Sequence, residues 1–436
     1  METELRRRAE ARGLDVGSSL PEGATSWVSC LLKRNRRDAQ MRQFSLAAGQ
    51  GYSMFVDKGG RLLTCGCDLA GRAPHLGHAV DPDADPTVRR EIGPPTPVPS
   101  MQNRRVVSVA TGVNHSLALS TEGEVYSWGN GQFGALGHGD VAERTVPCMI
   151  ESLSRIERIA AGSNSTSAAV DKNGRLFTWG RASVELTEDD WDEELDEFEG
   201  PSGLGYELDA EAKYQAISKR VDALSQERVV SVALGDGFTL AVTDAGAVFS
   251  FGSNRVGVLG HSSFVQHQVL PRRIDALVET GRPFVAVAAG NLHALALTEE
   301  GELYGWGDEI ANGLTPCRAE CKPRRVAALI GQRVKLMHAR DGASSAVTEK
   351  GELFTWGSGY EGPQFTPTRV AGLSGVVVAA VAIGSTHTLA ADADGVVWVF
   401  GQRSALGLDA SCAGENVVLL TPTPIPTLRV RVLNSP

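Results

Sequence analysis

Short runs in which apolar and polar residues alternate recur along the whole chain. In HSLALS (115–120) the period is two, which predicts a strand with one buried face. TEG (121–123) follows, and its glycine suits a tight hairpin turn that needs positive φ. EVYSWG (124–129) then alternates again, with an aromatic residue just before the last glycine. The pattern therefore predicts two strands joined by a tight turn.

The same block occurs seven times in register. Every copy has a glycine six residues before its final glycine. Five copies have a third glycine 17 residues before the final one, while the third copy has one extra residue and the sixth carries Arg340 instead. Repetition of this kind points to one repeat architecture rather than several domains. The copies occupy 46–66, 109–129, 159–180, 232–252, 287–307, 337–357 and 381–401.

A third and a fourth predicted strand complete each unit. An apolar strand precedes the first glycine, and a strand with a proline near its start or edge follows a loop of variable length. Four-stranded units repeated seven times predict an all-β fold, a seven-bladed β-propeller of antiparallel blades with a long acidic and helical insertion in the third repeat. We expect residues 1–42 to form an extension, helical or disordered, and 43–432 to form the propeller. The repeats lie near 43–100, 101–153, 154–228, 229–278, 279–329, 330–372 and 373–427, with the insertion at 181–228.

The unit at 110–140, ATGVNHSLALSTEGEVYSWGNGQFGALGHGD, resembles the repeat of the regulator-of-chromosome-condensation family. The resemblance covers about residues 43–427 and implies the propeller fold, but it is far less specific for function. Members include an exchange factor for a Ran-type GTPase, a plant ultraviolet photoreceptor, and propellers fused to ubiquitin ligases or kinases. The photoreceptor has an additional tryptophan in the loop before the histidine. The corresponding loops here lack it, so ultraviolet sensing is not expected.

The repeated aromatic and histidine positions are expected to serve the scaffold. A tryptophan at a strand end, just before glycine, is expected to pack between blades, and a histidine repeated in one loop is expected to bond neighbouring backbone. These structural positions are Gly112, His115, Trp128, Gly129, Trp179, Gly180, His293, Trp306, Gly307, Trp356, Gly357, His387 and Gly401.

The insertion after Gly180 departs most from the repeat. Ten of the fifteen residues at 185–199 are Asp or Glu, as many as the net charge of −10 of the whole chain. Trp191, Leu195 and Phe198 would share one face of a helix, with Asp189 and Asp190 among the acids around them. Such an arm could bind a basic partner, or it could be a solvated arm that folds back on the propeller. Residues 206–229 are predicted to form an amphipathic helix.

The loop of the sixth unit also departs from the repeat. Arg340 replaces the glycine and Asp341 follows it, while Asp236 holds the corresponding place in the fourth unit. These loops are expected on one rim near the central opening, where they are candidates for partner binding; ordinary surface charge is the alternative. A basic run at 33–37 could be a nuclear address or a phosphate contact, but the pI of about 5.5 opposes broad nucleic-acid binding.

No motif for hydrolysis, nucleotide binding or zinc is present, so we expect no enzyme, metal or cofactor. No apolar run could span a bilayer, the N-terminus lacks the apolar core of a signal peptide, and the cysteines are odd in number and scattered. These features favour a reducing compartment, cytoplasmic or nuclear.

Two functions remain open. The first is a protein-interaction scaffold that uses one rim and the acidic insertion, and that works as a monomer. The second is a guanine-nucleotide exchange factor for a Ran-like GTPase. In the family's exchange factor acidic rim residues lie just before the loop histidine, and no carboxylate holds that place here. The last strand-like segment, Leu428–Val432, is expected to pair beside the first blade and close the ring.

Overall fold

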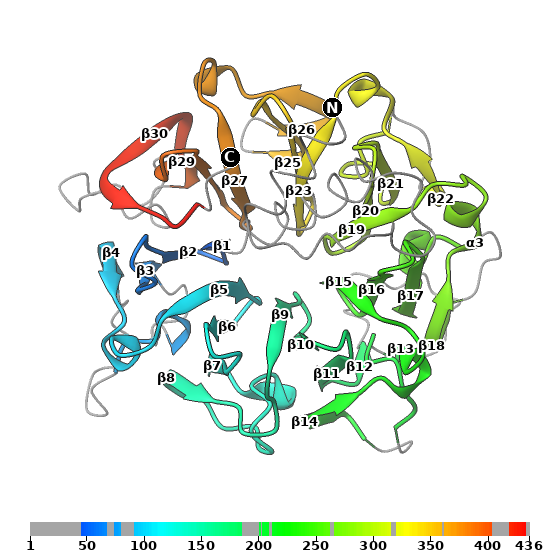
Figure 1. Cartoon of the computed structure of the whole chain (residues 1–436), viewed down its shortest axis with the longest axis horizontal. Helices are drawn as coiled ribbons and strands as arrows, with labels where there is room; N and C mark the ends of the chain where they lie inside the picture. The colour runs from blue at the N-terminus through cyan, green and yellow to red at the C-terminus, as the bar shows by residue number, and fades with distance from the viewer. Residues whose placement is uncertain are drawn as a thin grey trace, which may run out of the picture.

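Seven four-stranded antiparallel sheets surround a central axis in the computed structural model of this chain (Figure 1). The structure describes residues 45–67, 74–79, 91–184, 200–201, 203–208, 212–261, 266–314, 320–359, 362–402 and 418–432. Each sheet is one blade, and its first strand lines the axis. The predicted seven-bladed β-propeller is confirmed.

The first four blades follow chain order. Blade 1 contains β1 (Leu46–Ala48), β2 (Tyr52–Val56), β3 (Leu62–Cys67) and β4 (Glu91–Pro97). Blade 2 contains β5 (Val106–Thr111), β6 (His115–Ser120), β7 (Val125–Gly129) and β8 (Arg144–Met149). Blade 3 contains β9 (Ile156–Ala161), β10 (Thr166–Asp171), β11 (Leu176–Arg181) and β14 (Tyr214–Arg220). Blade 4 contains β15 (Val229–Leu234), β16 (Phe238–Thr243), β17 (Val248–Ser253) and β18 (His267–Arg273).

The last three blades have the same plan. Blade 5 contains β19 (Phe284–Ala289), β20 (His293–Thr298), β21 (Leu303–Gly307) and β22 (Glu320–Arg325). Blade 6 contains β23 (Val334–Arg340), β24 (Ala343–Thr348), β25 (Leu353–Gly359) and β26 (Gly362–Arg369). Blade 7 contains β27 (Val378–Ile383), β28 (His387–Asp392), β29 (Val396–Gln402) and β30 (Val418–Arg429). The described helices are short: η2 (Pro74–Leu76), η3 (Pro99–Met101), η4 (Gln132–Gly134), η6 (Asp222–Leu224), η7 (Arg255–Gly257), α3 (Asp275–Val278), η8 (Ala327–Leu329) and η9 (Ala371–Leu373).

The repeated glycines are explained by backbone geometry. The glycine of each second-to-third strand turn has positive φ, as in Gly123 at 81°. The final glycine of each repeat also has positive φ, and at Gly129 an added Cβ would lie 2.5 Å from the carbonyl oxygen of Asn114. No side chain can be accommodated there, so the spacing of the repeat reflects two backbone requirements.

The apolar core is divided among the contacts between blades. Seven clusters of buried residues each combine side chains of two neighbouring blades, and one of them joins blade 7 to blade 1. The tryptophans at the strand ends belong to this packing. Trp179 is fully buried, and its indole Nε1 donates to the carbonyl of Ala135 in the preceding blade at 2.9 Å. Trp128, Trp306 and Trp356 make the equivalent bonds to His75, Val258 and Ala311.

The predicted amphipathic helix over 206–229 is wrong. The segment contains the outer strand β14 and the single turn η6 instead. Val221 and Leu224 are buried, as the periodicity implied, but Ile217 is 50% exposed and pairs with His138 of blade 2 in an isolated bridge. A short hairpin of β12 (Ser183–Val184) and β13 (Gly200–Pro201) opens the insertion. The acidic arm at 185–199 lies outside the described residues, as does the extension at 1–42.

The segment at the end of blade 7 pairs beside blade 1, as expected. Val430 forms a bridge with Asp57 of blade 1, and the backbone N–H of Arg431 donates to the carbonyl of Val56 at 2.8 Å. Strand β30 itself pairs with β29 in blade 7, so this short segment fastens the last blade to the first.

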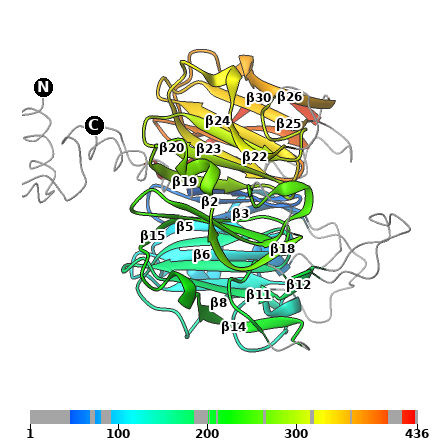
Figure 2. The same cartoon turned by 90° about the vertical axis from the view of Figure 1, so that its right-hand side faces the viewer.

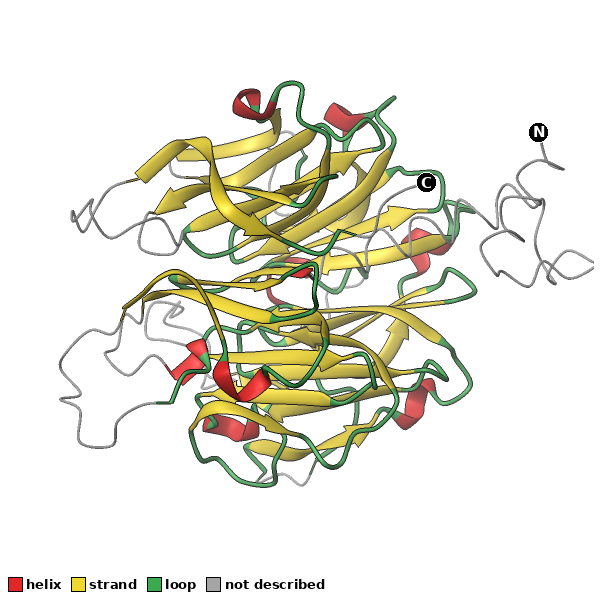
Figure 3. Ribbon diagram, turned by 60° about the vertical axis from the view of Figure 1, so that its left-hand side comes forward, coloured by secondary structure: helices red, strands yellow, loops and turns green. Residues whose placement is uncertain are grey.

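The ring has two distinct faces. Because each blade is a meander, its first-to-second and third-to-fourth strand connections lie at the same end of the sheet. We call the side formed by these ends the long-loop face and the opposite side the turn face. Figures 2 and 3 show the strands running between the two faces, and in Figure 2 β12 of the insertion lies on the right-hand, long-loop side.

Candidate functional site

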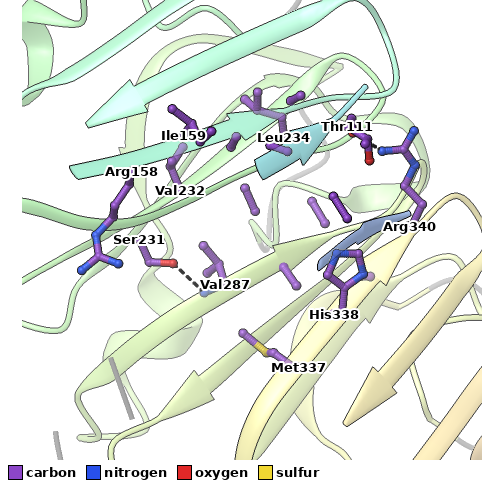
Figure 4. A pocket seen from close by; sticks show the side chains of 18 of the residues that line it. Thr111, Arg158, Ile159, Ser231, Val232, Leu234, Val287, Met337, His338 and Arg340 are labelled. Carbon is purple, nitrogen blue, oxygen red and sulfur yellow. Dashed lines mark hydrogen bonds between the residues drawn. The ribbon is translucent and has the colours of Figure 1, made fainter. Parts of the chain in front are cut away.

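The inner strands enclose a narrow central channel. Small apolar side chains line most of it, and the enclosed volume is about 110 Å³. Arg158, His338 and Arg340 are its main polar side chains (Figure 4). Arg158 lies on β9, and His338 and Arg340 both lie on β23. A channel this narrow leaves little space for a substrate.

Arg340 does not face a partner at the rim, contrary to the sequence-based expectation for its side chain. It is only 6% exposed, and its guanidinium crosses the channel from blade 6 to donate to the carbonyl of Thr111 in blade 2 (Figure 4). Its Nε lies 3.8 Å from a carboxylate oxygen of Asp341. Arg340 therefore links opposite sides of the ring.

An arginine fits at position 340 because residue 343, three positions later, is a small alanine. In blade 2 the equivalent position is Gly112, where an added Cβ would lie 2.1 Å from the ring of His115. Blade 6 has Ala343 in place of that histidine, so the Cβ of Arg340 meets no imidazole ring. The two departures from the repeat compensate for each other.

This compensation can be tested by substitution. R340G removes a buried side chain, and we expect the free energy of unfolding to fall by about 2 kcal/mol. The double variant R340G/A343H restores the glycine and histidine of blade 2 and should recover most of that loss. Urea denaturation of the parent and both variants measures this, and equal stability of R340G and parent would contradict it.

Three loops on the long-loop face are joined beside the channel. The backbone N–H of Asp236 donates to the carbonyl of Asn291 at 3.2 Å, and the N–H of Asn291 donates to the carbonyl of Asp341 at 2.8 Å. Asp236 and Asp341, predicted from corresponding places in the repeat, therefore flank one residue of blade 5. The Asp236 carboxylate also lies 3.7 Å from the guanidinium of Arg255. We call Asp236, Arg255, Asn291 and Asp341 the channel mouth.

The channel mouth is accessible to a partner. The Asp236, Arg255 and Asp341 side chains are 29%, 27% and 25% exposed. Val256, the next residue of η7, is exposed and has a φ of 49°, which is rare for a β-branched residue. The site thus combines two partly exposed carboxylates, one guanidinium and an apolar side chain, and can recognise a surface with complementary charge.

The loop histidines lie between blades rather than in a cleft. Burial lowers the pKa of His115 to about 4 and of His293 and His387 to about 3, so the rings are neutral near pH 7. Each Nε2 is paired with a serine hydroxyl of the next blade. Bonds to neighbouring backbone were expected, but the Nδ1 atoms of His293 and His387 have no hydrogen-bond partner among the described residues. The pairs are His115 with Ser167 at 2.9 Å, His293 with Ser344 at 2.7 Å and His387 with Ser53 at 2.8 Å.

Sequence reasoning missed a recurring element in the third-to-fourth strand loops. In blade 2 the carbonyl of Ala135 accepts hydrogen bonds from Trp179 and Ser167 of blade 3, while the carbonyl of Leu136 accepts one from Ser127. Gly137 then turns with a φ of 79°. The LGH motif in the sequence was the available signal. Equivalent segments, which we call wedge segments, occur at 75–77, 203–205, 258–260 and 311–313.

The described part of the chain offers no other obvious chemistry. It contains no group of three or more His, Cys, Asp or Glu side chains arranged to hold a metal ion. No helix in these ranges has the length and apolar character to cross a bilayer.

Seven four-stranded blades around a narrow channel, with a charged loop cluster at its mouth, define this chain as a repeat β-propeller. The family model described as the RCC1-like domain matches residues 19–359, and the chain belongs to this family. It is 34% identical over 337 residues to the human E3 ubiquitin-protein ligase HERC2, covering 68% of this chain and 7% of that protein. It is 34% identical over 216 residues to the ultraviolet-B receptor UVR8 of Arabidopsis thaliana, covering 49% and 43%.

Solved structures agree in fold. Prp20p of Saccharomyces cerevisiae has a TM-score of 0.68 at 22% identity, covering 90% of this chain and 89% of that one. Human WBSCR16 has a TM-score of 0.68 at 20% identity, covering 84% and 94%. The chain spans less than half the length of HERC2 and of UVR8.

Proposed function

We propose that this RCC1-like propeller is a non-catalytic interaction scaffold whose long-loop face binds a protein partner. The channel mouth carries the proposal, because it places Asp236 and Asp341 on either side of Asn291, on loops that are hydrogen-bonded to each other. Carboxylates held on a rigid surface attract a partner with basic side chains, such as a basic protein segment.

The position of the acidic insertion favours partner binding on the same long-loop face. It occupies the third-to-fourth strand loop of blade 3, between β11 and β14, so it starts and ends on the long-loop side. Its Asp189, Asp190, Trp191, Leu195 and Phe198 would add negative charge and apolar surface to partner binding. We further propose a cytoplasmic or nuclear monomer that does not bind membranes or nucleic acids.

Exchange on a small GTPase is the second candidate. One solved relative, Prp20p, is described by its binding to Gsp1p and histones, which favours a GTPase or a basic protein as partner. The exchange mechanism of that family cannot be assigned directly to this chain, because no carboxylate lies just before the loop histidine position in any repeat. Asp236 and Asp341 lie one residue earlier and would have to replace those carboxylates. A nucleotide-release assay with a panel of small GTPases separates the candidates, because a scaffold accelerates none of them.

Charge-neutralising substitutions test the scaffold. We expect D236N/D341N, combined with deletion of 185–199, to weaken binding of a lysine- and arginine-rich peptide at least about tenfold at low salt. Fluorescence anisotropy measures the affinity, and capture with mass spectrometry identifies partners. E122Q/D394N is the matched control, since it neutralises two exposed carboxylates on the turn face. Equal peptide binding by the parent and by D236N/D341N lacking residues 185–199 would refute the proposal.

A further inference from the structure

Blade 6 lacks the wedge segment that blades 1 to 5 place against the next blade. Strands β25 and β26 pair as far as Gly359 and Gly362, so only residues 360 and 361 separate them. In blade 2 the corresponding interval runs from Gly129 to Arg144 and contains η4 and the wedge segment. The position between blades 6 and 7 that a wedge segment would fill is therefore not filled by the loop of blade 6.

A cleft of about 440 Å³ lies at that position. Trp356 of blade 6 and Phe400 of blade 7 line it, together with Ile383 and Leu419 (Figure 1 shows the two blades). Phe400 stands where blades 2, 3, 5 and 6 have a tryptophan, so no indole N–H requires a carbonyl here. Apolar side chains therefore lie on both walls of the cleft, among polar ones.

Two hydroxyl groups in the cleft match those that bind wedge segments elsewhere. Thr355 corresponds to Ser127 and Thr178, which are fully buried and donate to the carbonyls of Leu136 and Leu204. Thr355 is partly exposed instead, and it lines the cleft.

Thr388 completes the pair on the side of blade 7. It corresponds to Ser167, which donates to the carbonyl of Ala135 in the wedge segment of blade 2 at 2.9 Å. Thr388 also lines the cleft, and neither threonine hydroxyl forms a hydrogen bond with another residue in the described ranges. One donor on each wall is thus placed for two successive carbonyls of a peptide.

We propose that this cleft binds a turn segment of a partner protein in which a leucine or similar aliphatic residue is followed by glycine. The aliphatic side chain takes the place that Leu76, Leu136, Leu204 and Leu259 hold in other blades, all of which are at most 2% exposed. The carbonyl before it accepts from Thr388 and its own carbonyl accepts from Thr355. The glycine supplies the positive φ found at the end of every wedge segment.

The surroundings favour an uncharged peptide over a charged ligand. The cationic side chain lining the cleft, Arg369, is paired with Glu352 at 3.0 Å. The cleft is separate from the channel mouth, and the proposal does not depend on partner binding at Asp236 and Asp341.

The probe is a fluorescein-labelled peptide that copies residues 131–139, GQFGALGHG, from the loop of blade 2. With the full chain we expect a dissociation constant on the order of 0.1–1 mM by anisotropy, as for a single small anchor. Replacing the leucine of the peptide by aspartate should weaken binding at least about tenfold. T355V/T388V in the protein should weaken it about tenfold, since both donors are removed while shape is kept.

A loop graft tests whether the peptide binds in this cleft. Residues 358–363 are replaced by residues 130–143, because Gly357 and Gln364 pair as Gly129 and Arg144 do. The graft should raise the melting temperature and abolish peptide binding, while D236N/D341N should leave peptide binding unchanged. Absence of binding by the parent, or equal binding by parent and graft, overturns the proposal. Binding that appears only after deletion of 403–417 also overturns it, because the chain's own segment would then be the occupant.

Discussion

Truncation after Thr427 is expected to lower the free energy of unfolding by about 5 kcal/mol, from the burial of Leu428 and Val430 and three backbone hydrogen bonds. Both side chains are at most 5% exposed in the cluster that joins blade 7 to blade 1. Since a domain is typically stable by only about 5–15 kcal/mol, the melting temperature should fall steeply.

The size of this effect follows from one hydrogen bond that recurs seven times. In blades 1 to 6 the carbonyl of the turn glycine accepts a hydrogen bond from the backbone N–H of the first residue of the next blade. The carbonyl of Gly60, for example, accepts from the N–H of Val106 at 2.8 Å. In blade 7 the carbonyl of Gly395 accepts the equivalent bond from the backbone N–H of Val430 at 2.9 Å. Val430 pairs with Asp57 as Val106 pairs with Ser120, so the C-terminal segment starts the inner strand that β1 continues. This explains why β1 has 3 residues and β5 has 6.

Three further variants separate closure of the ring from loss of chain length. Truncation after Val432 removes only residues 433–436 and should leave the melting temperature unchanged. V430D should destabilise nearly as much as the full truncation, whereas R431A keeps the backbone bonds and should have a small effect. An unchanged melting temperature after truncation at Thr427 would show that the segment does not hold the ring together.

The sequence predicted the blades because backbone geometry fixes the glycine spacing, but periodicity alone misassigned 206–229. Val221 and Leu224 lie three residues apart in a single turn that follows the outer strand. The same pattern follows other outer strands, as in Ile274 and Leu277 of blade 4. Comparing VDAL with IDAL between repeats would have shown that the apolar spacing belongs to this turn and not to a long helix.

The candidate site was predictable only in part. The common position of Asp236 and Asp341 on one face was predictable because equivalent loops of a ring lie on the same side. Their link through Asn291 was not, because it depends on backbone hydrogen bonds across blades. The burial of Arg340 could not be predicted from its place in the loop, because its guanidinium reaches across the channel to a blade far away in the sequence. The cleft between blades 6 and 7 follows from a missing segment, and its shape depends on the two blades that surround it.

Acidification is expected to destabilise the ring because several of its histidines accept protons less readily in the folded chain than in the unfolded chain. Burial lowers the pKa of His115 to about 4 and of His293, His338 and His387 to about 3. The pKa in the unfolded chain is about 6.5, so the unfolded state binds more protons between pH 6.5 and 4. At His338 the Nδ1 also accepts the backbone N–H of Ile383 at 3.2 Å, which a protonated ring could not do.

The stability contributed by these rings is therefore complete above about pH 6.5 and is lost progressively as the pH falls from there toward the folded-state values. Each histidine costs about 1.4 kcal/mol per pH unit in this range, so these four lower the free energy of unfolding by on the order of 5 kcal/mol at pH 5.5. His138 and His261, whose pKa values are also lowered to about 4, add to this loss. Urea denaturation at pH 7.5 and 5.5 measures this before most carboxylates titrate. H387N should reduce the pH dependence by about a sixth, and equal stability at both pH values would mean that the rings are protonated without loss of structure.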